Sequence, residues 1–414
     1  MVTVADHLQR LGHQVFVFSR DQGPAYEQLR DLGIPVADSL RAIDRSPDAI
    51  VANDAPSSAD AAAAFPSVPQ LYVAHSPIFD FQHPLEGISQ TIALVTMSSV
   101  VRRRVGASPL GQRLPIVELR QPVDLERFRP YRPLPERPRV ALSLSNYAGG
   151  ARLQLLERAC RALGIELLSA GLRKGGLRTD TPRLLNEADI VFAVGRTAVE
   201  AMACGRAVYV IAEEGAEGWV NETSYERLVA ANFSARADPR LPTLSSLTED
   251  LRAYTPDFGR QARELALRHH DPFRHVAALV DILRRHGDGV PAPRRDGVAT
   301  TLVEDVGRLV RLMWRHESEA FRLRRALDEA ELALGQARIE NDALRRRAGE
   351  LEREIEELKA ESERARRELA AAREHAERAA TSLRDELDAV YGSLRWRWSS
   401  ALLWPVDRWR SRSG

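Results

Sequence analysis

The stretch ADIVFAVGRTAVEAMACGRAVYVI, residues 188–211, decides how the rest of the chain is interpreted. It opens with an apolar run that ends at Val194, the pattern of a buried parallel strand. A Gly-Arg-Thr turn follows at 195–197, and residues 197–204 have the composition of a helix. A second apolar run, 207–212, predicts another strand. Strand, turn, helix and strand in this order predict one unit of a doubly wound α/β domain.

The turn between that strand and helix is a candidate phosphate site. Backbone amides at a helix start lack intrahelical acceptors and carry a partial positive charge, so they can hold an anion. Glycine at 195 allows a ligand to approach the backbone closely, and Glu200, one turn later, can accept hydrogen bonds from sugar hydroxyls. A plain strand–turn–helix crossover with a surface glutamate is an equally simple interpretation of the same residues.

Outward from this unit, apolar runs alternate with helical stretches in two regions, 1–121 and 139–286. Residues 122–138, between them, contain five prolines and predict a semi-rigid linker. We expect two α/β domains with parallel sheets, and a ligand between them. The first domain is expected to lack its first strand, because helix-like residues 2–11 come first. The other expected strands are Gln14–Phe18, Asp48–Ala52, Gln70–Ala74, Ile92–Thr96, Ile116–Leu119, Arg139–Leu144 and Ile165–Ser169.

The C-terminal region has a different composition. A breaker-rich linker at 287–300 precedes residues 301–390, which are rich in Arg, Glu, Ala and Leu. Two interleaved seven-residue series of mostly apolar residues begin at Leu302 and Val306 and predict a left-handed coiled coil. We expect a parallel homodimer through 302–383; the alternative is a lone solvated helix.

The tail, residues 391–414, contains four of the six tryptophans interspersed with arginines. Indole rings and guanidinium groups suit a membrane interface, so 393–410 is a candidate contact with an anionic membrane surface. Packing of the same rings against the coil or a partner is the alternative.

Composition excludes several classes of protein. The chain has 414 residues and a net charge of +1, which argues against binding nucleic acid through a general positive field. Only two cysteines occur, Cys160 and Cys204, so a disulfide framework is not expected and a reducing compartment is. No apolar run approaches the roughly 20 residues of a membrane span. Only two of the 59 basic residues are lysine, which suggests GC-rich coding and a bacterial source.

No metal site is expected, because the ten histidines do not group with other ligand types. The closest cluster, His269-His270-Asp271, is interpreted as a solvated turn at a helix break. Together with the absence of a signal peptide, these features predict a cytoplasmic protein, held peripherally at the inner face of the membrane by its tail.

Four stretches resemble glycosyltransferase family 4, whose members are retaining enzymes of the GT-B fold. They are LGHQVFVFSR (11–20), VPQLYVAHSPIFD (68–80), RQPVDLERFRP (120–130) and VGRTAVEAMACGRAV (194–208). The resemblance covers about residues 1–286. It implies GT-B architecture, α/β with two doubly wound Rossmann-like domains, the first binding the acceptor and the second the nucleotide sugar.

The resemblance also implies roles for individual residues. Glu200 resembles the glutamate that binds the ribose hydroxyls, and Gly195, Arg196 and Thr197 would form the diphosphate-binding turn. His75 resembles the histidine that faces the transferred sugar and would be the catalytic residue. The family uses no metal for the leaving diphosphate, so no cofactor is expected beyond the nucleotide-sugar donor.

Other positions match the family less well. Arg152 is the nearest candidate for the arginine that neutralises the diphosphate, with Arg173 and Lys174 as weaker ones. Phe192 stands where many members carry a second acidic residue, eight positions before the ribose glutamate.

The resulting hypothesis is a retaining glycosyltransferase of cell-surface glycan synthesis, moving a sugar from a nucleotide diphosphate to a polysaccharide or lipid-linked acceptor. One alternative is a non-catalytic GT-B-like scaffold that acts through its coiled coil. A nucleotide-sugar epimerase shares the fold, but the linker motif within RQPVDLERFRP (120–130) fits such an enzyme poorly.

Overall fold

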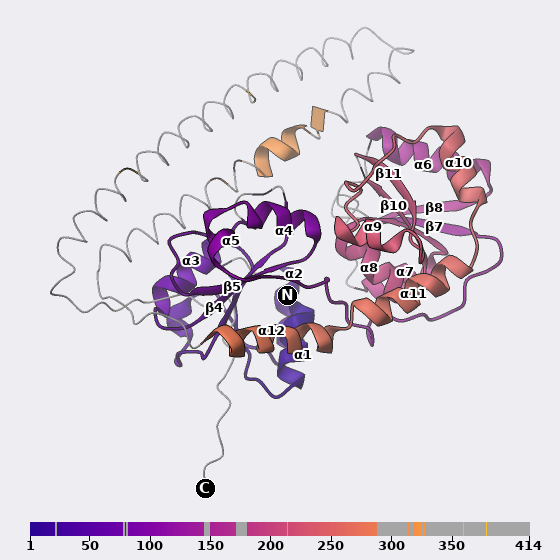
Figure 1. The fold of residues 1–414 in the computed structure, drawn as a ribbon. Coiled ribbons are helices and arrows are strands. Elements are labelled where there is room, and N and C mark those ends of the chain that lie inside the picture. Colours follow the sequence, from indigo (N-terminus) through magenta and orange to yellow (C-terminus); the bar gives the residue numbers. More distant parts are fainter. Residues whose placement is uncertain are drawn as a thin grey trace, which may run out of the picture.

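A computed structural model gives the fold of most of the first 287 residues. It describes residues 1–20, 23–77, 79, 82–144, 150–170, 180–212 and 214–287, with scattered residues between 313 and 378. Residues 318–324 are helical (Figure 1). The expected coiled coil, apart from these scattered residues, the expected tail, Arg173 and Lys174 lie outside the described residues.

The first unit is built on a four-stranded parallel sheet. Its strand order is β3-β4-β5-β6, with bounds Ile50–Ala52, Gln70–Ala74, Thr91–Thr96 and Ile116–Glu118. All residues of the first three strands are buried, which explains why their sequences are continuous apolar runs. Two short strands, β1 (Val17–Phe18) and β2 (Val36–Ala37), pair separately in parallel. The accompanying helices are α1 (Val2–Arg10), α2 (Pro24–Asp31), η1 (Leu40–Ala42), α3 (Ala55–Ala64), α4 (Ser99–Gly106) and α5 (Pro109–Arg113).

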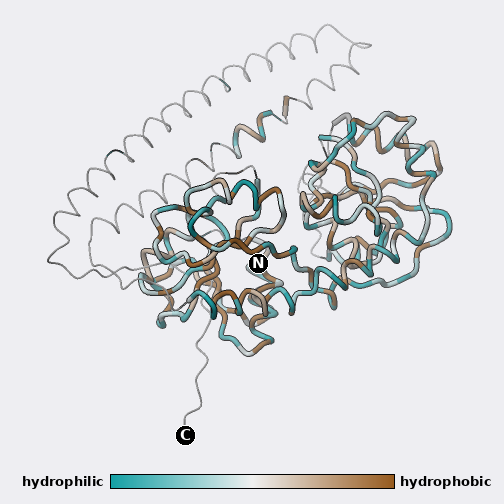
Figure 2. The backbone as a smooth tube through the Cα atoms, viewed as in Figure 1, coloured by the Kyte–Doolittle hydropathy of each residue, from teal (hydrophilic) through white to brown (hydrophobic). Residues whose placement is uncertain are grey.

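The second unit has a five-stranded sheet of order β11-β10-β9-β7-β8. The strands are β7 (Val140–Leu144), β8 (Glu166–Ala170), β9 (Ile190–Ala193), β10 (Ala207–Ala212) and β11 (Gly215–Trp219). Its helices are α6 (Gly150–Ala162), α7 (Thr181–Glu187), α8 (Gly195–Ala203), α9 (Tyr225–Ala230), α10 (Leu244–Arg252) and α11 (Asp257–His269); the last helix along this part of the chain is α12 (Pro272–His286). In both units the strands form an apolar centre (Figure 2).

Strand order in the second sheet defines a ligand-binding edge. From β7 the chain forms β8 on one side and then returns to form β9 on the other. The strand order therefore reverses between β7 and β9, which pair in parallel. Ligands of open α/β sheets bind at the carboxyl ends of the strands at such a switch point. The turn that follows β9 is the Gly195 turn.

Most of the expected strands are present, with ends shifted by a few residues. The antiparallel edge strand β11 was not expected from the sequence. Its sequence, GAEGW, contains two glycines and a glutamate, so it has no apolar run that would identify a strand. Pairing with β10 and a bridge from Ala216 to Arg240 hold it in place.

The two closing helices divide between the units. Helix α11 packs against α8 and β10 of the second unit, whereas α12 packs against α1 and β5 of the first (Figure 1). Apolar residues of α12, Val276 and Leu279 among them, share a core with Val4 and Leu8 of α1. The stretch 257–286, expected to close the second unit as a whole, therefore returns the chain to the first.

The chain thus crosses between the units twice, and the two crossings are hydrogen-bonded to each other. His270 Nδ1 lies 2.7 Å from the carbonyl oxygen of Gln121, and His275 Nδ1 lies 3.1 Å from that of Arg120. The amide of Val123 donates to the carbonyl of His270 at 3.0 Å. These bonds fasten the start of the proline-rich linker to the α11–α12 junction.

A series of side-chain hydrogen bonds extends from this crossing to α9. The hydroxyl of Tyr225 lies 2.9 Å from His270 Nε2, and Arg120 donates to the same hydroxyl at 3.1 Å. Arg120 also donates twice to the carboxylate of Glu226, at 2.9 and 2.8 Å. Since His270 Nδ1–H donates to a carbonyl, its Nε2 is the acceptor of the Tyr225 hydroxyl.

The expectation that His269-His270-Asp271 is a solvated turn is wrong for its central residue. His270 is 1% exposed, and burial lowers its pKa to about 4. His269 stacks on the ring of Tyr225, and Asp271 caps α12 by accepting from the amide of Arg274. A linear polar run gives no sign that two crossing segments bury its middle residue.

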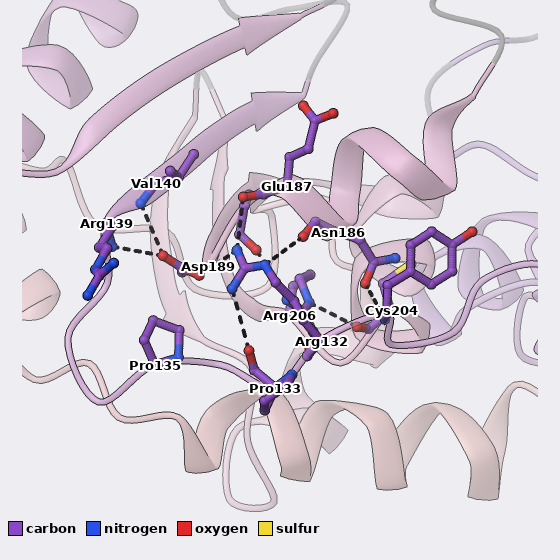
Figure 3. A network of polar contacts seen from close by, with 12 residues as sticks. Arg132, Pro133, Pro135, Arg139, Val140, Asn186, Glu187, Asp189, Cys204 and Arg206 are labelled. Atoms are coloured by element: carbon purple, nitrogen blue, oxygen red, sulfur yellow. Dashed lines mark hydrogen bonds and ion pairs between the residues drawn. The ribbon is translucent and has the colours of Figure 1, made fainter.

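The linker itself is fixed to the second unit by arginines (Figure 3). Arg206, 1% exposed, donates to the carbonyls of Cys204, Ala188 and Arg132. Arg132 in turn forms an ion pair with Asp189 at 2.7 Å. Asp189 also accepts from the amides of Arg139 and Val140, where β7 begins. A buried guanidinium surrounded by carbonyls is tolerated because its donors have partners.

We predict that His270→Phe lowers the free energy of unfolding by about 1–3 kcal/mol, because it leaves the buried Gln121 carbonyl without its donor. The matched control is His269→Phe, which keeps the stacking on Tyr225 and should be close to neutral. Urea unfolding measures both. Equal stability of the two variants would contradict a hydrogen-bonding role for His270.

The lowered pKa of His270 also predicts that the stability of the protein depends on pH. Above the ordinary pKa of 6.5 neither the folded nor the unfolded state is protonated at His270, whereas between 6.5 and about 4 only the unfolded chain takes up a proton. The wild-type protein should therefore lose stability over that range as the pH falls, and His270→Phe should lose less.

Candidate functional site

Two polar residues stand at the carboxyl edge of the first sheet. Asn53 follows β3 directly, and His75 follows β4. Because these strands are parallel neighbours, the two residues leave the sheet at the same edge. His75 Nε2 lies 2.8 Å from Asn53 Oδ1. The sequence predicted His75 as a site residue but did not identify its partner.

The turn after β9 has the backbone that its sequence predicts. Gly195 has φ +54°, in the left-handed region that favours glycine, and its amide donates to the carbonyl of Phe233 at 3.0 Å. Helix α8 begins at this glycine, so the first amides of the helix, including that of Thr197, lie at the switch-point edge of the sheet.

The segment that supports this turn is itself strained. Asn232, Phe233 and Ala235 all have positive φ, at 52°, 52° and 57°. Each such residue costs about 1–2 kcal/mol relative to a right-handed conformation. The amide of Phe233 is held by the carbonyl of Leu228 and its carbonyl by the amide of Gly195. Strain retained beside the turn is consistent with a functional constraint there.

Arg196 and Glu200 form an ion pair along α8. Arg196 Nε donates to Glu200 Oε1 at 2.7 Å, and the glutamate side chain is 12% exposed against 45% for the arginine. Arg196 Nη2 also donates to Thr3 Oγ1 of α1, at 3.3 Å. The first turn of α8 in the second unit therefore contacts the first helix of the other unit.

Arg196 of the second unit acts electrostatically on His75 of the first. The side chain of His75 keeps exposed surface and bonds to Asn53. Desolvation is the main cause that lowers the pKa of His75, and the Met1 amino group, His275 and Arg196 act in the same direction. The imidazole is therefore neutral at neutral pH.

The two other positions that the sequence singles out and the structure describes are Arg152 and Phe192. Arg152 lies in the first turn of α6, which follows β7, and β7 neighbours β9. It is thus at the same edge of the sheet as the Gly195 turn. Phe192 lies in β9 with 2% exposure and meets Tyr209 edge-on at 5.9 Å between ring centroids. Its position is part of the apolar core.

Sequence reasoning missed three residues that the structure adds to this region: Asn53, Thr3 and His275. Asn53 was detectable, since polar residues that end neighbouring parallel strands meet at one edge. Thr3 and His275 were not, because they reach the region through the packing of α1 against α12.

Among the described residues, no three His, Cys, Asp or Glu side chains group as a metal site. None of the described helices is both long and apolar enough to cross a membrane.

No protein-family model and no curated protein matches the chain. Among solved structures, it is similar to a glycosyltransferase from Rickettsia africae ESF-5, with 13% sequence identity and a TM-score of 0.42. That match covers 70% of this chain and 94% of the other.

Proposed function

We propose that this protein is a retaining, metal-independent glycosyltransferase that moves a sugar from a nucleotide diphosphate donor to a polysaccharide or lipid-linked acceptor. One observation carries the proposal: Arg196, which is paired with Glu200 at the switch-point edge of the second sheet, also donates to Thr3 of the first unit and acts electrostatically on His75. The resemblance of these residues to glycosyltransferase family 4 gives the reaction type.

The geometry suggests a division of labour in the donor site. The amides of the Gly195 turn and the Arg196 guanidinium would bind the diphosphate, and Arg152 would approach it from the neighbouring crossover. Arg196 uses Nε and Nη2 for Glu200 and Thr3, so Nη1 is its nitrogen without a partner among the described residues. Only Oε1 of Glu200 accepts a hydrogen bond from Arg196, so Oε2 would accept from the ribose hydroxyls.

Catalysis under this proposal is mainly positioning and charge stabilisation. Negative charge develops on the leaving diphosphate, where helix amides and a guanidinium stabilise it without a metal. His75 would contact the transferred sugar from the other unit. The hydrogen bonds of His270 and His275 at the crossing between the units would hold the two halves of the site in register.

One alternative has an observation in its favour, whereas the other is disfavoured by the linker. The apolar position of Phe192 favours a non-catalytic scaffold, because the second acidic residue of many family members is missing. A nucleotide-sugar epimerase would use the same switch-point edge, but Pro122-Val123-Asp124, with Phe128 and Pro130, fits the transferase linker.

The C-terminal region would serve assembly and location. We propose a parallel homodimer through 302–383 and reversible contact of 393–410 with an anionic membrane surface, at the cytoplasmic side. Both rest on sequence pattern, because these residues lie almost entirely outside the described part of the chain.

We predict that Glu200→Gln weakens nucleotide-sugar binding by about 1.5–3 kcal/mol, roughly 10- to 150-fold in Kd, because a charged acceptor is lost. Calorimetry with uridine, guanosine and adenosine diphosphate sugars measures it, and a thermal melt checks the fold. The control is Glu264→Gln, which breaks an equivalent i,i+4 pair with Arg260 on the exposed face of α11. Unchanged affinity in Glu200→Gln would remove Glu200 from the site, and no binding by the wild type would favour the scaffold.

We predict that segment 302–383 sediments as a dimer, with a rod about 120 Å long at 1.5 Å per residue. Asn341 occupies an inward position, where a buried amide pair fixes register and strand number. Asn341→Leu should therefore raise stability and permit other oligomers. A monomer at tens of micromolar, or an unchanged oligomeric state and register in Asn341→Leu, would argue against this assembly.

We predict that the full chain floats with anionic liposomes at low salt and that a chain ending at Ala389 does not. Each basic residue near an anionic surface contributes about 1 kcal/mol, so binding should weaken as salt is added. Arg395, Arg397, Arg408 and Arg410 supply the charge. Equal flotation of both chains, or no flotation of either, would reject a membrane role for the tail.

A further inference from the structure

The contact between Asn53 and His75 determines which nitrogen of the imidazole carries the proton. Asn53 Nδ2 donates to the carbonyl of Val51 at 3.4 Å, which fixes the orientation of the amide. The atom that faces His75 is therefore Oδ1, an acceptor only, at 2.8 Å from Nε2. Nε2 must carry the hydrogen of this bond, and the tautomer follows from the hydrogen-bond pattern.

The other ring nitrogen, Nδ1, then carries a lone pair and no hydrogen. A neutral imidazole has one donor and one acceptor, so Nδ1 is the acceptor. Among the described residues no partner engages Nδ1 of His75. Three groups that are cationic when protonated act electrostatically on the ring from three different elements: the Met1 amino group before α1, Arg196 of α8 and His275 of α12. Together with desolvation they oppose a second proton on the ring.

We propose, on the basis of the function proposed above, that Asn53 is a positioning residue that holds His75 in the Nε2–H tautomer, so that Nδ1 receives a hydroxyl of a neutral sugar. A hydroxyl has a hydrogen to donate to this lone pair. A carboxylate, as in a uronic acid, has only acceptor oxygens and meets the lone pair unfavourably. The Asn53–His75 pair thus selects the class of sugar that faces it.

Without Asn53 this selection disappears. A free imidazole exchanges between two tautomers, and the Nδ1–H form would present a donor to the same position. An aspartate at 53 would still accept from Nε2–H, but its negative charge would favour the protonated ring.

The test is nitrogen NMR of the full chain labelled at histidine, with the His75 signals identified by their loss in His75→Gln. The wild type should show Nε2 protonated and Nδ1 bare. Asn53→Asp should keep this tautomer and raise the pH midpoint of His75 by about one unit or more. Asn53→Leu, similar in size but without an acceptor, should populate both tautomers. The control is Asn221→Leu, a half-buried asparagine of the second unit, which should leave the His75 signals unchanged.

Three NMR results would overturn the proposal: a protonated Nδ1 in the wild type, an unchanged tautomer in Asn53→Leu, or an unchanged His75 midpoint in Asn53→Asp. The last comparison holds even if Asn53→Leu does not fold. None of these readouts requires transferase activity.

Calorimetry then tests the choice of sugar, with each nucleoside diphosphate hexose paired with the matching uronic acid. The hexose should bind at least about tenfold more tightly, and Asn53→Leu should reduce that ratio. Equal or tighter binding of the uronic acid would reject the hydroxyl selection, even with the expected tautomer. Binding of neither sugar would reject the proposed function, and the NMR result alone would then decide the role of Asn53.

Discussion

Two hydrogen bonds from imidazole to backbone carbonyl hold the crossing between the two units, and the candidate site depends on them. His270 and His275 donate to the carbonyls of Gln121 and Arg120, where the chain leaves the first unit. His75 belongs to the first unit and Glu200 to the second, so any change at this crossing alters their relative position. Arg120 reinforces it by reaching Tyr225 and Glu226 of α9.

The histidines of this region act as neutral hydrogen-bonding groups. Burial lowers the pKa of His270 and of His275 to about 4, and the pKa of His75 is lowered as well. Positive charge is instead carried by Arg120 and Arg196, each of which pairs with a glutamate of the second unit. A diphosphate arriving at α8 would therefore meet an arginine whose orientation a carboxylate already fixes, which reduces the entropy lost on binding.

Backbone strain and a buried polar network both lie beside the second sheet. The positive-φ residues Asn232, Phe233 and Ala235 lie in the segment that supports the Gly195 turn, and Arg206 with Arg132 fastens the linker where β7 and β9 begin. Both features cost free energy locally and are held by hydrogen bonds from other elements. The positive-φ segment lies at the switch-point edge beside the Gly195 turn, whereas Arg206, Arg132 and Asp189 lie at the opposite edge of the sheet, where β7, β9 and β10 begin.

The sequence by itself determined most of the strands and the place of the Gly195 turn. Apolar runs such as Gln70–Ala74 are buried on both faces of a parallel sheet, and that burial requires the pattern that identifies them. Only the tertiary structure decided that α12 joins the first unit, that His270 is buried, and that Asn53 meets His75. The reason is physical: periodicity reports the burial of a single element, whereas the Asn53–His75 and His270–Gln121 contacts join residues 22 and 149 positions apart, and α12 lies still further along the chain from α1. Which of these segments meet depends on how the whole chain folds.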